Sequence, residues 1–263
     1  MSVRIDDMEV AYSEVGRGDP LVLIHGLADD HRAWRRTLPD LMLHRRVFLY
    51  DLRGHGQTTL GTPHGNLRQL GNDLLEFMDA IHLEQVDIAG FSLGGTVAMR
   101  FAIDFPMDVR GLVLVATSSR VGRVAADWYR QRVDMVERGD PQLRETLDRD
   151  TADVYAESPG ELEEALMIRR ESTADPRGYG NACAAMAALN EAPLDPDLGR
   201  ITVPTLIVAS EKDRHCPPKA AEIIAAGIKG SRLEIIPDAG HPIPVEKPHE
   251  LAGSINSFLA EIA

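Results

Sequence analysis

The sequence has only two cysteines, Cys183 and Cys216, among its 263 residues. This count excludes a disulfide framework and favours a reducing compartment, with both cysteines as ordinary thiols. Basic residues are also scarce: 28 Lys and Arg stand against 41 Asp and Glu, for a formal net charge of −13. Because nucleic acids and anionic membranes are bound by concentrated Lys and Arg, we expect neither as a main partner.

Long apolar runs are missing as well. Runs such as residues 111–116 are far shorter than the roughly 20 residues needed to cross a bilayer. The first residues, MSVRIDD, lack the basic start and apolar segment of a signal peptide, so we expect a cytoplasmic protein. The sequence also has no His-x-x-x-His motif, no metal-binding cysteine pair and no glycine-rich nucleotide loop, and therefore no metal or other cofactor is expected.

Short runs of Val, Ile and Leu recur along the chain and are typical of strands buried on both faces of a parallel sheet. These runs are residues 21–24, 47–50, 86–89, 112–115, 206–209 and 233–236. Stretches with helical spacing lie between most of them, at 66–82, 94–105 and 217–228, and a last one begins near residue 248. The alternation predicts an α/β fold, with a mostly parallel sheet covered by helices on both faces.

The alternation stops between about residues 119 and 197, where the sequence is charged and helical. We interpret this segment as an inserted helical cap that divides one core into residues 1–118 and 198–263. Inside it, the sequence Ser158-Pro159-Gly160-Glu161 has an N-cap serine, a proline at the first helical position and a glutamate placed for a capping box. A helix is therefore predicted to begin near Pro159.

The segment that carries most chemical information is Gly90-Phe91-Ser92-Leu93-Gly94, which follows a buried-strand run and precedes a helical stretch. Gly-x-Ser-x-Gly between a strand and a helix is the nucleophile-elbow pattern, in which a tight turn exposes the serine hydroxyl. A chance match is the alternative in a chain with 22 glycines, but the position of the motif favours Ser92 as a nucleophile. The Leu93 N–H would then help to stabilise a developing oxyanion.

A serine nucleophile needs a base, and the base needs an acid that orients it. Three of the nine histidines, His215, His241 and His249, follow the last strand able to carry that acid. His241 is best placed because its loop comes directly after the run at 233–236, whereas His249 begins the final helix and reads as a surface residue. Glu211 and Asp213 both follow the preceding strand, and the order of residues alone leaves the acid open between them.

Two further segments border the predicted site. His25-Gly26-Leu27 ends an early strand where a second oxyanion donor is expected, and we assign that role to the Leu27 N–H, with His25 holding the loop. The segment Asp51-Leu52-Arg53-Gly54-His55-Gly56 gathers Asp, Arg and His, which invites a metal or acid–base interpretation. Its two glycines after a strand favour a structural turn at the rim of the site instead.

Taken together, these motifs resemble the α/β-hydrolase superfamily over essentially the whole chain. The resemblance rests on His25-Gly26, Asp51-x-Arg53-Gly54-His55-Gly56, Gly90-Phe91-Ser92-Leu93-Gly94-Gly95, Asp213 and Gly240-His241. It implies the α/β-hydrolase fold, Asp213 rather than Glu211 as the acid of a Ser92–His241–Asp213 triad, and no cofactor. Residues 117–122 (TSSRVG) and 175–183 (DPRGYGNAC) are similar to 3-oxoadipate enol-lactonases and related esterases.

This closer resemblance implies a small-molecule substrate, an ester or lactone, cleaved through an acyl-Ser92 intermediate. Within the cap, Arg120, Trp128, Tyr129 and Arg130 are candidates to line a pocket for an aromatic or carboxylate-bearing substrate, although packing and solvated charge are the more common reason for such residues. Trp34 is expected in the core, with the pocket wall as its alternative.

Several functions stay open at this stage. A general carboxylesterase fits the motifs as well as an enol-lactonase, and a perhydrolase or haloperoxidase-like enzyme would use peroxide in place of water. Carbon–carbon bond hydrolysis is a further alternative within the fold. A non-catalytic small-molecule receptor on the same scaffold is the alternative from another class, because a fold does not fix a function. The oligomeric state is also open, a homo-oligomer included.

Overall fold

The computed structural model describes residues 1–262, and across them eight strands form one sheet in the order β1-β2-β4-β3-β5-β6-β7-β8. The strands are β1 (Ser2–Ile5), β2 (Met8–Gly16), β3 (Pro20–Ile24), β4 (Arg46–Tyr50), β5 (Val86–Phe91), β6 (Val109–Val115), β7 (Thr205–Ser210) and β8 (Arg232–Ile236). From β4 to β8 in this order every neighbouring pair is parallel. The predicted α/β class, with a mostly parallel sheet, is confirmed.

The first two strands were not anticipated from the sequence. β1 pairs with β2 and β2 with β4, both in antiparallel fashion, at one edge of the sheet. Met8 and Val10 of β2 are buried, and its other seven residues are partly or fully exposed. Its sequence MEVAYSEVG is therefore too polar to give the continuous apolar signal of the central strands. All six predicted runs, by contrast, lie within strands of the sheet.

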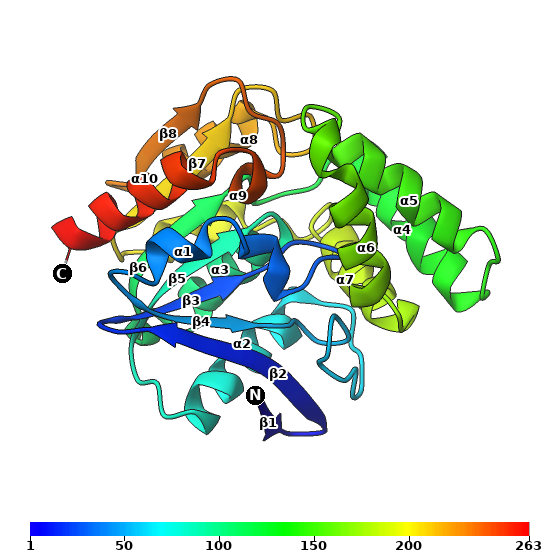
Figure 1. Ribbon diagram of the computed structural model, residues 1–263, viewed down its shortest axis with the longest axis horizontal. Coiled ribbons are helices and arrows are strands. Elements are labelled where there is room, and N and C mark those ends of the chain that lie inside the picture. The colour runs from blue at the N-terminus through cyan, green and yellow to red at the C-terminus, as the bar shows by residue number, and fades with distance from the viewer. Residues whose placement is uncertain (263) are drawn as a thin grey trace.

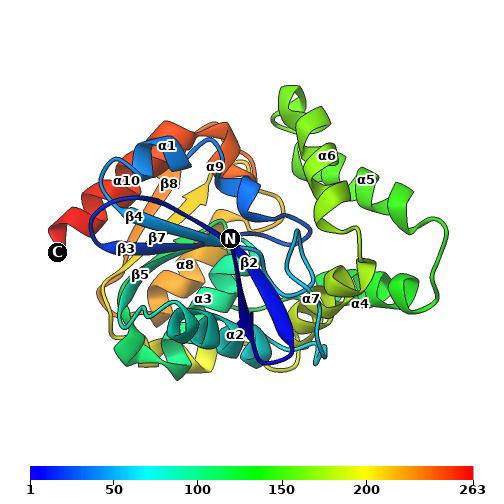
Figure 2. The ribbon, with the colours of Figure 1, turned by 60° about the horizontal axis from the view of Figure 1, so that its bottom comes forward.

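Helices cover both faces of the sheet (Figures 1 and 2). One face carries α1 (Leu38–Leu41), α9 (Ile243–Glu246) and α10 (Pro248–Glu261), and the other carries α2 (Leu67–Ala80), α3 (Leu93–Asp104) and α8 (Pro218–Gly227). Short 3₁₀ helices occur at η1 (His31–Trp34), η2 (Pro106–Asp108) and η4 (Asp195–Arg200). Within residues 1–262, no helix has the length and apolar character that crossing a membrane requires.

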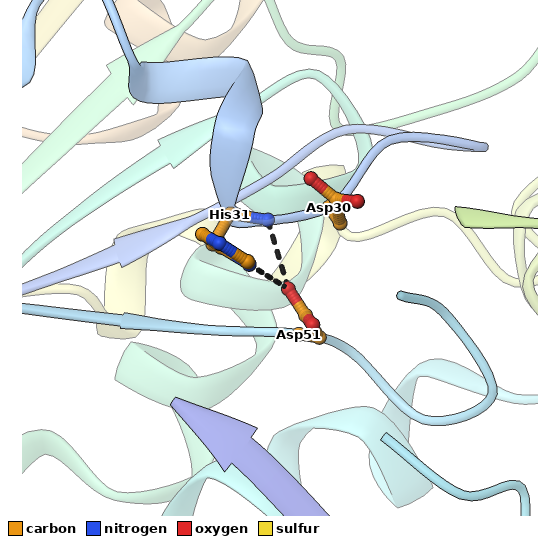
Figure 3. A group of neighbouring side chains, drawn as sticks. All are labelled: Asp30, His31 and Asp51. Carbon is orange, nitrogen blue, oxygen red and sulfur yellow. Dashed lines mark hydrogen bonds and ion pairs between the residues drawn. The ribbon is translucent and has the colours of Figure 1, made fainter. Parts of the chain in front are cut away.

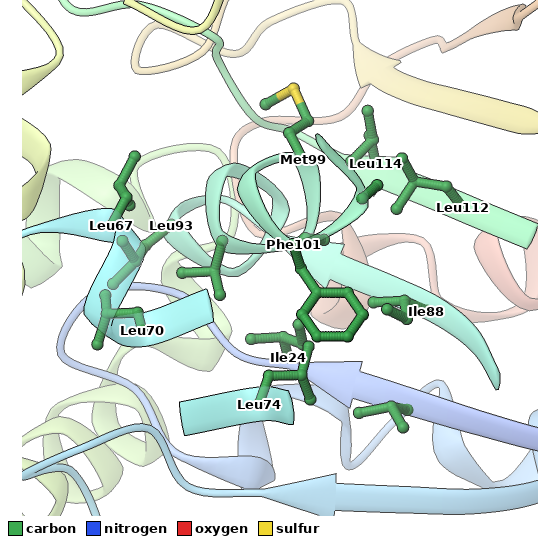
Figure 4. Close-up of a cluster of buried hydrophobic side chains, with 14 of the residues drawn as sticks. Ile24, Leu67, Leu70, Leu74, Ile88, Leu93, Met99, Phe101, Leu112 and Leu114 are labelled. Carbon is green, nitrogen blue, oxygen red and sulfur yellow. The ribbon is translucent and has the colours of Figure 1, made fainter. Parts of the chain in front are cut away.

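Two hydrophobic clusters fasten these layers together. Alternate residues of β3 point to opposite faces, so Val22 and Ile24 join the cluster under α2 and α3, while Leu21 and Leu23 join the one under α10. Burial on both faces explains why the strand sequences are continuously apolar. Figure 4 shows the first cluster, in which side chains of α2 and α3 pack on the sheet: Ile24, Leu67, Leu70, Leu74, Ile88, Leu93, Met99, Phe101, Leu112 and Leu114.

Four helices follow β6 and lie to one side of the sheet, on the right in Figure 1. They are α4 (Arg123–Glu137), α5 (Leu143–Val154), α6 (Leu162–Ser172) and α7 (Pro176–Ala188). The 3₁₀ turn η3 (Pro159–Glu161) leads into α6, so helical structure does begin at Pro159. The predicted capping box is wrong, because the Ser158 hydroxyl donates to the Glu246 carboxylate at 2.7 Å and caps no helix.

Candidate active site

Four loops converge where the parallel strands end. They follow β3, β5, β7 and β8, and because parallel strands present their carboxyl ends at one edge, residues far apart in sequence meet there. Ser92 comes from the loop after β5, Asp213 from the loop after β7 and His241 from the loop after β8. Ser92, Asp213 and His241 are far apart in the sequence but therefore lie close together at this edge of the sheet.

Ser92 lies at a sharp turn between β5 and α3. Its backbone has φ of 53° and ψ of −118°, a conformation that a residue with a side chain adopts only when its surroundings enforce it. The Ser92 N–H donates to the Val115 carbonyl at 2.9 Å, and the Thr117 hydroxyl donates to the Ser92 carbonyl at 2.7 Å. These bonds to β6 and the loop after it hold the strained turn in place.

The two glycines of the motif make this turn sterically feasible. A Cβ atom at Gly90 would overlap the Gly94 carbonyl group, and a Cβ atom at Gly94 would overlap the Ile24 carbonyl group. The close approach of α3 to both β5 and β3 therefore excludes any side chain at these positions. Their role follows from packing against backbone, since neither glycine has a positive φ.

The side chains of Ser92, His241 and Asp213 form a continuous hydrogen-bonded chain. The distance from Ser92 Oγ to His241 Nε2 is 3.0 Å, and that from His241 Nδ1 to Asp213 Oδ2 is 2.8 Å. A carboxylate can only accept, so the hydrogen lies on Nδ1 and leaves Nε2 free to accept from the serine hydroxyl. Asp213 and His241 are buried, at 3% and 6% exposed, whereas Ser92 is partly exposed.

The Asp213 carboxylate is held in its ionised form. Burial by itself raises the pKa of this group, but the nearby His241, its hydrogen bond and the N–H groups of Cys216 and His215 outweigh burial, so the pKa lies below its usual value. Both N–H groups donate to Oδ1 at 2.8 Å. The carboxylate is therefore fixed in orientation and ionised beside His241.

The competing candidates lie elsewhere. His249 is exposed and its Nδ1 lies 2.6 Å from an Asp40 carboxylate oxygen, away from Ser92. Glu211 is exposed and accepts a hydrogen bond from the Asp238 N–H. Among the three C-terminal histidines, the structure brings His241 to Ser92, and of the two acids it brings Asp213 to His241.

The predicted oxyanion donors border Ser92. Leu27 lines the same cavity as Ser92, and Leu93 is the first residue of α3, where an N–H has no acceptor within the helix. His25 is fully buried: its Nδ1 lies 2.8 Å from the Gly26 carbonyl oxygen, and its Nε2 accepts from the Leu52 N–H at 2.8 Å. These bonds give His25 the structural role that we expected, namely holding the loop.

A cavity of about 650 Å³ opens onto the Ser92 hydroxyl and reaches beneath the four additional helices. This volume lies in the range of small-molecule sites. Of the predicted pocket residues, Trp128 and Tyr129 line the cavity from α4. Their rings contact each other edge to face at 5.0 Å, and Arg132 stacks on Trp128. The cavity therefore has an aromatic wall opposite the sheet.

Three other predicted pocket residues are not at the cavity. Arg120 is 55% exposed and pairs with Asp195, and Arg130 pairs with Asp127 and Glu191 at the surface. Trp34 is fully buried in the hydrophobic cluster under α10, which is the position that the sequence favoured. Charge and aromaticity suggested these residues, but the directions of their helices and loops turn them away from Ser92.

Three polar residues that line the cavity were not predicted as pocket residues: Asp29, Arg169 and His215, the last of which was considered only as a candidate base. Asp29 follows Leu27 by two residues, and its carboxylate pairs with Arg169 of α6. His215 places its ring 5.2 Å from that of His241, with 35% of its side chain exposed. The pKa of His215 is lowered by burial and by the charge of His241, which keeps this ring neutral near neutral pH. No spacing rule identifies an arginine such as Arg169 of α6.

Asp30, His31 and Asp51 bring three potential metal-ligand atoms within 4.8 Å of one another (Figure 3). Their oxygens already have protein partners. Asp51 accepts from the N–H and Nδ1 of His31 and from the Gln57 N–H, while both Asp30 oxygens accept from Arg32. This set of bonds ties η1 to the loop after β4, which supports a structural role for that turn.

The rest of the turn is held in the same way. Arg53 forms a bidentate pair with Asp73, with Nε and Nη2 at 2.8 and 2.6 Å from the two oxygens, and also donates to the Leu60 carbonyl. His55 is buried with its ring 5.4 Å from that of His25. The charged residues of this segment are thus satisfied within the core, away from Ser92.

Residues 19–248 match the family model described as the alpha/beta hydrolase fold. The chain therefore belongs to the α/β hydrolase fold family. It is 30% identical to a 2-hydroxy-6-oxo-2,4-heptadienoate hydrolase of Pseudomonas putida, over 96% of this chain and 93% of the relative. It is 26% identical to 3-oxoadipate enol-lactonase 2 of Acinetobacter baylyi, over 96% and 94%. The superfamily predicted from the motifs is confirmed, and the relatives identify a hydrolase.

Solved structures agree with this assignment. A hydrolase from Pseudomonas aeruginosa superimposes with a TM-score of 0.88 at 29% identity, covering 98% of this chain and 97% of the other. The enol-lactonase from Burkholderia xenovorans gives a TM-score of 0.88 at 24% identity, covering 99% and 100%. At that identity the second similarity concerns the fold alone.

Proposed function

We propose that this protein hydrolyses a small carboxylic ester or lactone through an acyl intermediate on Ser92. The observation that carries the proposal is the hydrogen-bonded chain from Ser92 Oγ through His241 to Asp213, with distances of 3.0 and 2.8 Å, at the wall of a 650 Å³ cavity. The enol-lactonase relatives support an ester-type bond as the one cleaved.

In the first half of the reaction, Ser92 Oγ attacks the substrate carbonyl carbon while its proton passes to His241 Nε2. Asp213 stabilises the resulting imidazolium through Nδ1. The carbonyl oxygen becomes an oxyanion, for which the Leu27 and Leu93 N–H groups are the donors; each such donor contributes on the order of 10²–10³ in rate. Collapse breaks the bond to the alcohol oxygen, which takes the proton from His241.

In the second half, His241 takes a proton from water, the hydroxide attacks the acyl carbon, and the proton returns to Ser92 as the acid leaves. With a linear ester, the alcohol departs before this step. With a lactone, the released oxygen stays attached to the acyl group, so the cavity must hold the opened ring until water attacks. A cavity under a cap suits a substrate that keeps both halves bound.

We further propose that residues 119–197 act as the cap of residues 1–118 and 198–263. The aromatic wall of Trp128 and Tyr129 would bind the acyl part of the substrate by apolar contact. Arg120 has no place in this scheme, because it pairs with Asp195 outside the cavity.

Carbon–carbon bond hydrolysis is the second candidate. It is favoured by the P. putida relative, which is named for the hydrolysis of a 2-hydroxy-6-oxo-dienoate. The same serine, base and oxyanion donors can serve attack on a ketone carbon. In that reaction, however, the leaving group takes up its proton on carbon, whereas in ester hydrolysis it takes up its proton on oxygen. The geometry of the triad fits both reactions, so the two functions are distinguished by which substrate is turned over.

The test is turnover of three substrates: a carboxylate-bearing enol-lactone, p-nitrophenyl acetate and 2-hydroxy-6-oxohepta-2,4-dienoate. The Ser92→Ala variant serves as the blank for each. Ser118→Ala is the matched control, because Ser118 also lines the cavity but donates to the Arg120 carbonyl rather than to a histidine. Turnover of the lactone or ester that is lost only in Ser92→Ala supports the proposal.

Other outcomes of these assays would indicate a different function. Turnover of the dienoate alone moves the assignment to carbon–carbon hydrolysis, and ester turnover that survives Ser92→Ala refutes the nucleophile. A peroxide-dependent halogenation would indicate the perhydrolase alternative, and binding of these compounds without turnover would indicate a receptor. A cofactor-free reaction and a cytoplasmic location stay predictions from the sequence.

A further inference from the structure

The loop that carries Leu27 is strained and short. Ala28 has φ of 64°, the left-handed region that a residue with a side chain rarely adopts, and the Asp29 N–H donates back to the Gly26 carbonyl at 3.3 Å. A turn of this kind persists only when its surroundings hold it. The position of the Leu27 N–H therefore depends on what fixes the residues directly after it.

Those residues are fixed by the cap rather than by the sheet. Arg169 of α6 donates from Nε and Nη2 to the two Asp29 carboxylate oxygens, at 2.9 and 3.3 Å. One turn further along α6, the Ser172 hydroxyl donates to the Asp29 carbonyl at 2.5 Å. The side chains of Asp29 and Arg169 are only 5% and 11% exposed, so water screens their attraction weakly.

We infer that Asp29 and Arg169 form a clamp through which the cap positions the oxyanion loop. The inference rests on the proposed function, in which the Leu27 N–H stabilises the oxyanion. Such a donor works only when it already lies about 2.7–3.1 Å from the place of the oxyanion, and a displacement of about 1 Å costs as much as 10²-fold in rate. Asp29 and Arg169 are thus positioning residues, and kcat depends on a contact made by the cap.

The alternative for Arg169 is direct contact with substrate. Arg169 lines the cavity, and its Nη1 donates no hydrogen bond within residues 1–262. The two roles have different kinetic consequences. If Arg169 contacts the substrate, its variants change KM, and Asp29 variants bind substrate almost normally. If the two residues form a clamp, variants of either residue lower kcat, and their effects are not additive.

The experiment measures kcat and KM for p-nitrophenyl acetate in Asp29→Asn, Arg169→Gln and the double variant. We expect each single change to lower kcat by tenfold to a hundredfold with KM changed less than about threefold. The double variant should be no worse than the poorer single variant, because both remove the same contact. The double variant also leaves no unpaired buried charge, which protects the fold.

A matched control comes from the same helix. Glu171 of α6 pairs with Arg32 of η1 at 2.6 Å, and Arg32 also pairs with Asp30, so this contact joins the cap to the core without involving Asp29 or Leu27. Glu171→Gln should keep kcat within twofold. If it lowers kcat as much as Arg169→Gln does, attachment of the cap in general is what matters and the clamp is refuted.

A second readout reports on the oxyanion site itself. Ser92 Oγ adds to the carbonyl carbon of a trifluoromethyl ketone, its proton passes to His241, and the ketone oxygen becomes an oxyanion. The inhibition constant of this adduct should weaken in the Asp29 and Arg169 variants by the same factor as kcat/KM. The planar product acetate should bind as in the wild type, which a general loss of structure would not allow.

The remaining results also distinguish the clamp from its alternatives. A raised KM in Arg169→Gln alone, with kcat unchanged, overturns the clamp in favour of substrate contact. If the neutral variants do not fold, Arg169→Lys keeps the charge but loses the bidentate geometry; a severalfold lower kcat supports the clamp and a normal kcat refutes it. Failure of the proposed function is distinct, since it appears as wild-type turnover that does not depend on Ser92.

Discussion

The hydrogen bonds around Asp213 lead to a specific expectation for the Asp213→Asn variant. Oδ1 accepts the N–H groups of His215 and Cys216, both at 2.8 Å, and Oδ2 accepts from His241. An asparagine must keep its oxygen where the two backbone donors point, because an amide NH₂ cannot accept. Its NH₂ group is then forced to face His241 Nδ1.

This orientation reverses the tautomer of His241. Nδ1 now accepts from the amide, so the hydrogen moves to Nε2, and Nε2 can no longer take the proton of Ser92. An orienting acid replaced in this way costs a serine hydrolase roughly 10⁴ in kcat, which is about 5 kcal/mol of transition-state stabilisation. The change is isosteric, so the fold should keep its stability to within a small fraction of that amount.

The assay is kcat/KM for p-nitrophenyl acetate at pH 7, with circular dichroism and thermal unfolding to verify the fold. Glu211→Gln is the matched control, since this neighbouring carboxylate is exposed and accepts only from the Asp238 N–H; it should change kcat/KM less than twofold. A folded Asp213→Asn protein that loses less than tenfold would show that the geometry at Asp213 does not set the tautomer of His241.

Three further predictions concern stability and binding. The pKa of His55 is lowered to about 4, mainly by burial, against about 6.5 in an unfolded chain. As the pH drops from 6.5 to 4, the unfolded chain binds a proton at His55 before the folded protein does, so the free energy of unfolding should fall by roughly 3 kcal/mol. The His55→Asn variant lacks this titrating group, so urea titrations should show a smaller fall for it. Gly94→Ala should destabilise the protein by about 1–3 kcal/mol or more, because the added methyl group overlaps β3. Gly253→Ala, at an open position of α10, should instead stabilise the protein by roughly 0.5–1 kcal/mol. Thermal unfolding measures both changes, and equal effects of the two variants would contradict the packing argument. Arg120→Gln should leave KM for a carboxylate-bearing lactone within twofold, and a large rise would return Arg120 to the binding site.

Local pattern was enough to predict most of the fold. The central strands are buried on both faces, so their apolar runs are continuous and stand out, and the helices between them follow at regular intervals. The edge strand β2 was missed because half of its side chains face away from the core. The capping box at Ser158 was wrong because a distant carboxylate, that of Glu246, takes its hydroxyl.

The candidate triad was also predictable, for a physical reason. A nucleophile elbow needs glycines at fixed positions around Ser92, since any Cβ there would overlap backbone, and this leaves a local mark in the sequence. His241 and Asp213 lie on loops directly after strands, so the strand pattern locates them. Motif, strand order and loop position therefore sufficed to predict Ser92 and His241, whereas the choice of Asp213 over Glu211 needed the family resemblance.

The cavity wall depended on tertiary structure alone. Asp29 and Arg169 are separated by 140 positions and meet only because α6 packs over the loop after β3. Arg120 and Trp128 carry similar sequence signals, yet one pairs with Asp195 at the surface and the other lines the cavity. The sequence by itself determined the central strands of the sheet, the elbow and the order of the triad, because each depends on the spacing of residues that are close together in the chain. Which cap side chains face Ser92 was decided by how helices pack, and helix packing depends on contacts between segments that no local pattern records.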